Sequence, residues 1–186
     1  MNTYKCLNQN EFQYNEYKIV PIRYEDRLDI MKWRNEQIYH LRQEKPLTEK
    51  GQENYFKNTV SELFIEEKPI QILFSLLKNN ICIGYGGLVH INWIDLHAEI
   101  SFIMDTELES DNFEEIWSNF LYLIDKVAFN DLKIHKLNTY AYDLRPHLYD
   151  ILEKNNYKKE AILKEHKYFN FKFIDVIVHA KINKNE

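Results

Sequence analysis

Two neighbouring apolar segments most constrain how this chain folds, because each contains a residue type that a strand normally avoids. Residues 81–88 (ICIGYGGL) and 98–105 (AEISFIMD) predict two strands joined by a turn near residues 92–95. Three of the four glycines lie in the first segment, and glycine inside a strand usually marks a bulge or a close approach of backbones. Glu99 lies in the second, where a carboxylate is costly unless it is paired, solvated or functional. Together these features predict a site at this pair of strands.

Length and charge narrow the class of protein. A chain of 186 residues predicts a single domain over residues 1–186. The net charge of -5, from 24 basic and 29 acidic residues, does not favour nucleic acid or an anionic membrane as a partner. Cys6 and Cys82 are too few for a disulfide framework, which favours a reducing cytoplasm.

Targeting and membrane signals are not expected. Residues 1–10 are polar and predict no signal peptide, and residues 1–15 are expected to form a loose segment. No apolar run approaches the ~18 residues that a membrane-spanning helix needs.

Hydrophobic periodicity predicts an alternation of strands and helices. Helices are expected at 24–37, after an N-cap at Thr48, at 113–127 and at 146–154. Strands are expected at 17–23, 70–77, 81–88, 98–105, 134–142, 160–168 and 172–182, the last two joined by a tight turn at 169–170. This order predicts the α/β class: a mixed, mostly antiparallel sheet of about seven strands with helices on both faces.

The order of elements, with several local matches, resembles the GNAT superfamily of acyl-CoA-dependent N-acetyltransferases. The matches run through residues 17–182 in the family's order. They are MKWRN at 31–35, IGYGGL at 83–88, AEISFIM at 98–104, the approach to the fifth family strand at 129–137, LEKNNY at 152–157, and Asp175 in the last strand. The WRN residues and Asp175 are similar to the branch that acetylates amino sugars or protein N-termini.

The resemblance implies transfer of an acetyl group from acetyl-CoA to a primary amine of a small molecule, with a nucleotide-linked amino sugar as the expected acceptor. A protein N-terminal amine is the rival acceptor, and a monomer or homodimer is expected. No metal is expected, because His90 and His97 lack a third ligand at a recognisable spacing. The competing hypothesis is a GNAT-like binding or scaffold protein that has lost acetyl-CoA.

Two residues are the candidates for proton transfer. The acceptor amine must lose a proton, and a carboxylate in a half-apolar strand suits that task. Glu99 is the expected base, acting directly or through a water; the alternative is that it pairs with a basic residue across the sheet. The family tyrosine that protonates the leaving thiolate is replaced by Leu152, so Tyr149, one turn earlier, is the candidate acid.

The resemblance also implies binding residues. The backbone of Phe102, Ile103 and Met104 is expected to face the pantetheine arm, and one of its N–H groups would polarise the thioester. Further cofactor contacts are expected at Ser110, Asp111, Asn112 and Asn138. Acceptor contacts are expected at Trp33, Arg34, His90, Trp93 and His97. Alternative roles stay open: Trp33 as a core residue, Arg34 as a structural ion-pair partner, and the two histidines as surface or core residues.

The segment 106–115 departs from the family pattern. The family's phosphate loop is rich in glycine and follows a basic residue or a glutamine, whereas this segment (TELESDNFEE) contains neither glycine nor a basic residue. Asp111 and Glu114 predict a capping box that takes the N–H groups a phosphate would use. Five acidic side chains would repel a pyrophosphate, which is the observation behind the scaffold hypothesis.

Overall fold

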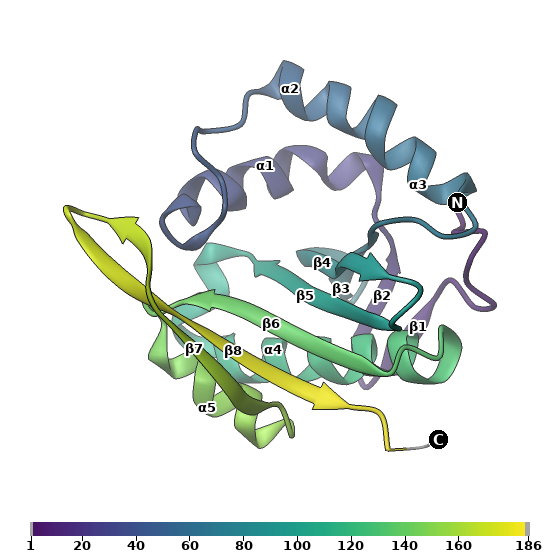
Figure 1. Cartoon of the computed structure of the whole chain (residues 1–186). Coiled ribbons are helices and arrows are strands. Elements are labelled where there is room, and N and C mark those ends of the chain that lie inside the picture. Colours follow the sequence, from purple (N-terminus) through teal and green to yellow (C-terminus); the bar gives the residue numbers. More distant parts are fainter. Residues whose placement is uncertain (1, 185–186) are drawn as a thin grey trace.

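An eight-stranded mixed sheet runs through the computed structural model, which describes residues 2–184 (Figure 1). Its strand order is β1-β2-β3-β4-β5-β6-β8-β7. The strands are β1 (Phe12–Tyr14), β2 (Tyr17–Pro21), β3 (Ile72–Lys78), β4 (Ile81–Asn92), β5 (His97–Met104), β6 (Lys136–Tyr142), β7 (Lys158–Phe169) and β8 (Lys172–Ile182). The predicted fold class is confirmed, and the strand beyond the expected seven is β1.

Helices cover both faces of this sheet (Figure 1). One face carries α1 (Arg27–Glu36), α2 (Glu49–Asn54) and α3 (Ser61–Ile65), and the other carries α4 (Glu109–Asp125) and α5 (Pro146–Lys154). The expected N-cap is confirmed, because the Thr48 hydroxyl accepts a hydrogen bond from Gly51 N at 3.1 Å. Pro146 occupies the first turn of α5, where its missing N–H costs nothing.

The sheet contains one parallel junction, between β5 and β6, while its other neighbouring strands are antiparallel. This pairing extends only over His97–Glu99 and Lys136–Asn138. Beyond these residues β5 continues to Met104 and β6 to Tyr142 without pairing to each other. The two strands therefore diverge and leave backbone groups of both strands available along the gap.

The β4 glycines mark a close approach of backbones. A Cβ added at Gly86 would lie 2.2 Å from the Ser101 carbonyl oxygen of β5. A Cβ added at Gly87, where φ is +155°, would lie 2.0 Å from the Ile72 oxygen of β3. No side chain fits either position without moving a strand, so Gly86 allows β5, and Gly87 allows β3, to lie close to β4.

The expectation of a loose segment before residue 16 is wrong for its described part. Tyr4 is 1% exposed, and its hydroxyl donates to Leu73 O and accepts from Leu73 N, both at 2.9 Å. Leu7 and Phe12 are also buried in the core. Three large side chains bury enough apolar surface to order a segment whose composition is mostly polar.

The predicted capping box at Asp111 is also wrong. A 3-10 turn, Thr106–Leu108, leads directly into α4, and its N-cap is Asp105, which accepts from Glu107 N at 3.1 Å. Helix α4 therefore begins at Glu109, four residues before the expected start, and Asp111 lies within its first turn. An Asp in a first turn interacts favourably with the helix dipole without serving as the cap.

Candidate active site

A cleft of about 510 Å³ opens where β5 and β6 diverge. Its lining comes from the strands, from α1 and the segment after it on one face, and from α4 and α5 on the other. The lining residues are Arg34, His40, Leu41, Arg42, Ile70, Gln71, Val89, His90, Glu99, Ile100, Ser101, Phe102, Trp117, Thr139, Tyr140, Ala141, Tyr142, Arg145 and Leu148. Because helices on both faces contribute, the cleft spans the sheet between the two strands, and two reactants can approach from opposite sides.

Backbone direction along β5 determines which groups face this cleft. Asp105 N donates to Ile83 O of β4 at 2.9 Å, and backbone groups alternate in direction along a strand. The N–H and C=O of Ile103 therefore point to β4, whereas those of Phe102 and Met104 point to the gap. The Met104 carbonyl accepts from Gln37 Nε2 at 2.8 Å. Phe102 lines the cleft and Met104 does not, so Phe102 N–H is the donor of the expected trio that faces the cleft.

Three buried polar atoms that line the cleft have no hydrogen-bond partner within residues 2–184. They are Trp117 Nε1, Thr139 Oγ1 and Arg145 Nε. A buried donor without a partner costs about 1–3 kcal/mol, and natural folds retain few of them. Three of the six such side-chain atoms in residues 2–184 therefore belong to residues of this cleft.

Glu99 forms an ion pair with Arg42, and its side chain is 12% exposed. Arg42 belongs to the segment that follows α1, so its guanidinium reaches Glu99 from above the sheet rather than across it. The same guanidinium lies 4.8 Å from the centre of the Tyr140 ring. Glu99 is therefore paired with a basic residue, although not across the sheet as the alternative role expected, and this pair also holds the Glu99 carboxylate at the cleft.

Arg145 is a cleft residue that sequence reasoning missed. It is the N-cap of α5 and is 5% exposed. Its Nη2 donates to Glu109 Oε1 at 2.6 Å, and its Nη1 lies 3.0 Å from His40 Nε2. Burial, with the Arg145 charge beside it, lowers the pKa of His40 to about 3. The available signal was an arginine directly before the proline that opens a helix, on the loop that follows β6.

The acidic segment around the start of α4 is largely compensated by charge. Glu107 pairs with Lys32 at 3.1 Å, Glu109 with Arg145, and Glu114 with Lys154. Glu115 accepts from Tyr17 at 2.6 Å and lies 3.4 Å from Lys78. The repulsion expected from five free carboxylates is thus much reduced.

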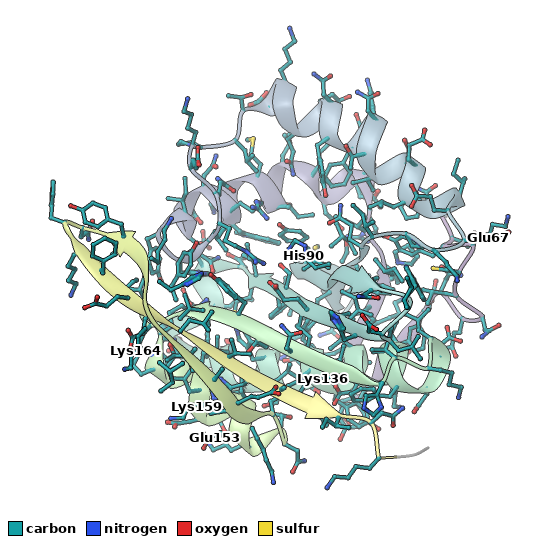
Figure 2. The ribbon with its side chains drawn as sticks, in the orientation of Figure 1. Glu67, His90, Lys136, Glu153, Lys159 and Lys164 are labelled. Atoms are coloured by element: carbon teal, nitrogen blue, oxygen red, sulfur yellow. The ribbon has the colours of Figure 1, made fainter. Side chains whose placement is uncertain are left out.

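The predicted acceptor residues divide into two groups. Arg34 and His90 line the cleft, and Figure 2 shows His90 between the sheet and the helices above it. Trp33 is only 3% exposed and packs in the hydrophobic core, which agrees with the alternative core role stated for it. Trp93 Nε1 donates to Pro69 O at 2.9 Å, and His97 pairs in register with Lys136 at the closed end of β5; neither lines the cleft.

The remaining predicted residues lie around the cleft rather than in its lining. Ser110 and Asp111 are exposed and Asn112 half-buried on the first turn of α4, and Asn138 closes the paired part of β6. The Tyr149 hydroxyl donates to Asp143 Oδ1 at 3.1 Å, and its ring stacks on His179. Burial, followed by the hydrogen bond to Asp143, raises the pKa of Tyr149.

Two kinds of site were not found in residues 2–184. These residues contain no group of three or more His, Cys, Asp or Glu side chains able to hold a metal ion. None of their helices combines the length and apolar character needed to cross a membrane.

Comparisons with known proteins agree with this geometry. No curated protein matches the chain. Spermidine N-acetyltransferase from Vibrio cholerae in complex with CoA and spermine is similar in structure, with 18% identity and a TM-score of 0.77, over 90% of this chain and 96% of that chain. A dodecameric structure of spermidine N-acetyltransferase from Vibrio cholerae in an intermediate state has 19% identity and a TM-score of 0.73, over 90% and 94% of the two chains.

At sequence identities of 18% and 19%, the structural similarity shows that the fold is shared and nothing further. A family model described as an acetyltransferase (GNAT) domain matches residues 19–178, from β2 into β8. Because that match covers most of the chain and includes the diverging strands, the protein belongs to the GNAT family of acetyltransferases.

Proposed function

We propose that the cleft between β5 and β6 binds acetyl-CoA and transfers its acetyl group to a primary amine of a small molecule. The observation that carries this proposal is the set of three unpartnered buried atoms along the gap between the diverging strands. Trp117 Nε1–H and Arg145 Nε–H are donors, and the Thr139 hydroxyl both donates and accepts. These groups fit the alternating amide C=O and N–H groups of a pantetheine chain.

When bound, acetyl-CoA supplies an acetyl thioester that the acceptor amine attacks. In the proposed step a C–N bond forms, the C–S bond breaks, and the sulfur leaves as a thiolate. Phe102 N–H, which faces the gap, donates a hydrogen bond to the carbonyl oxygen as negative charge develops there. A backbone donor held in a strand needs no reorganisation for this task.

Glu99 is the proposed base. Its carboxylate lines the cleft and is held by Arg42, so it has a defined position beside the gap. The amine proton passes to this carboxylate, directly or through a water. A thiolate is a good leaving group, so the position of Tyr149 outside the lining does not prevent the reaction; Tyr149 keeps only the role of a proposed distant proton donor.

The start of α4 is the proposed site for the pyrophosphate of CoA. Ser110 and Asn112 lie in its first turn, at the positive end of the helix dipole, which favours an anion. Arg145 lies close by and compensates Glu109, one of the acids of residues 106–115, through their ion pair. The compensated acids and this arginine support binding over the scaffold hypothesis.

The acceptor is proposed to be a small amine, with a nucleotide-linked amino sugar as the finer proposal. The WRN residues support it, because Arg34 lines the cleft. Asp175 gives it no support, since its carboxylate accepts from Lys164 Nζ at 2.7 Å and Glu165 N at 2.9 Å within the β7–β8 hairpin. A protein N-terminal amine stays the rival acceptor.

Calorimetric titration with acetyl-CoA tests the proposal. Thr139→Val removes an unpartnered hydroxyl at nearly constant volume, so we expect unchanged or higher stability and roughly tenfold weaker acetyl-CoA binding. Glu99→Gln is expected to lower kcat by about 10²-fold or more while the Kd for acetyl-CoA stays within about twofold. Absence of heat and of thermal stabilisation at millimolar acetyl-CoA would overturn the proposal.

A further inference from the structure

The half of the cleft beneath α1 has more positive than negative charge. Arg34 and Arg42 line it on this side together with one carboxylate, Glu99, which Arg42 already neutralises. His40 adds no charge at neutral pH, because its pKa is lowered to about 3. A net positive pocket in a chain of net charge -5 requires an explanation.

Arg34 is the cation that lacks a counter-ion. Its Nε donates to Gln43 Oε1 at 2.8 Å, and its Nη1 donates to the Tyr85 hydroxyl. Both partners are neutral, and no carboxylate within residues 2–184 forms an ion pair with it. Its Nη2 group forms no hydrogen bond within that range, so the guanidinium keeps donors for a ligand.

The segment after α1 holds this guanidinium in place. Asn35 Oδ1 accepts from Leu47 N at 2.7 Å and from Gln43 Nε2 at 3.2 Å, and Asn35 Nδ2 donates to Leu47 O at 2.9 Å. Gln43 is therefore fixed between Asn35 and Arg34. A pre-oriented arginine loses little side-chain entropy when it binds an anion, which is the arrangement expected of a recognition residue rather than of a solvated surface charge.

We propose that Arg34 binds an anionic group of the acceptor, so that the preferred acceptors are amines that also carry a phosphate or a carboxylate. This inference rests on the proposed function and deepens it by naming the acceptor class. The amine of such a molecule faces Glu99, and its anion pairs with Arg34. A nucleotide-linked amino sugar belongs to this class, whereas a polyamine such as spermidine would place further positive charge against an unpaired arginine.

Binding of matched amines to the protein saturated with CoA tests the proposal. The probes are glucosamine 6-phosphate, β-alanine, glucosamine and spermidine, measured by calorimetry. We expect the phosphate or carboxylate amine to bind roughly 10- to 100-fold more tightly than glucosamine, the range for a hydrogen bond to a charged group. Tighter binding of glucosamine 6-phosphate than of β-alanine indicates that the anion is a phosphate, and the reverse indicates a carboxylate.

Variants of Arg34 separate this role from a structural one. Arg34→Gln is expected to abolish the preference for the anionic amine while the Kd for acetyl-CoA stays within about twofold, and Arg34→Lys is expected to retain part of it. Arg27→Gln is the matched control, because Arg27 lies on the same helix, pairs with Glu53 at 2.8 Å and does not line the cleft.

Two results would overturn the inference. One is an anionic amine that binds no better than glucosamine or spermidine, and the other is a preference that survives in a folded Arg34→Gln variant. Failure of the wild-type protein to bind acetyl-CoA would instead refute the proposed function itself. Failure of the inference about Arg34 is therefore distinguishable from failure of the proposed function.

Discussion

Gly86→Ala tests the idea that the spacing of β4 and β5 positions the reacting groups. Gly86 faces Phe102 across the β4–β5 ladder. An added Cβ would lie 2.2 Å from Ser101 O and 2.8 Å from Phe102 Cα, both backbone atoms that cannot rotate away. The substitution therefore pushes β5 away from β4 at the residue whose N–H is proposed to stabilise the developing negative charge.

The size of the effect follows from these contacts. Restoring an ordinary contact with the Ser101 oxygen requires a separation larger by about 1 Å, and such overpacking costs roughly 1–3 kcal/mol or more. For a chain of this length each kcal/mol lowers Tm by about 2–4 °C. A misplacement of about 1 Å costs on the order of 10²-fold in rate. We expect a Tm lower by about 2–12 °C and a kcat/KM lower by about 10²-fold.

The assay combines thermal unfolding with acetyl transfer at a temperature where the variant is folded. Gly51→Ala is the control, since Gly51 lies in the exposed helix α2 and an added Cβ would meet only the Thr48 side chain, at 3.1 Å. Alanine favours a helix by about 1 kcal/mol over glycine, so this control is expected to retain activity and stability. A Gly86→Ala protein with a Tm within about 2 °C of wild type and a rate within twofold would refute the reasoning.

Two further predictions concern stability. Tyr4→Phe removes a hydroxyl that donates to Leu73 O and accepts from Leu73 N, so urea denaturation should show a loss of about 2–3 kcal/mol; a loss below about 0.5 kcal/mol would contradict the packed N-terminal segment. His40 has a folded pKa of about 3, whereas an unfolded histidine titrates near pH 6.5. Below about pH 6.5 the unfolded chain therefore binds a proton that the folded chain does not, and stability is lost as the pH falls from 6.5 towards 3. Between pH 6.5 and 5.5 the loss from His40 is about 1 kcal/mol, and denaturation of His40→Gln at both pH values should lack this part of the slope.

Much of the fold was predictable because it depends on local patterns. Buried and less buried residues alternate along most of β5, and apolar residues recur at helical spacing in α4; these periods determine which face of each element is buried. Thr48 and Pro146 act at the starts of their helices through contacts within a few residues. The predictions were wrong where the sequence pattern was polar, as in residues 2–15, or where the pattern was compatible with two different first residues of a helix, as at α4.

The candidate site was predictable only in part. The sequence by itself determined the order of elements, the close contact that Gly86 requires and the presence of Glu99 in a strand, because each is a property of residue type and local period. Only the tertiary structure decided that β5 and β6 separate after Glu99 and Asn138. It alone brings Arg42 to Glu99 across 57 positions and Arg145 to Glu109 across 36. Charge pairing acts over a few ångströms in space, whatever the separation along the chain, so it leaves no periodic signal in a single sequence.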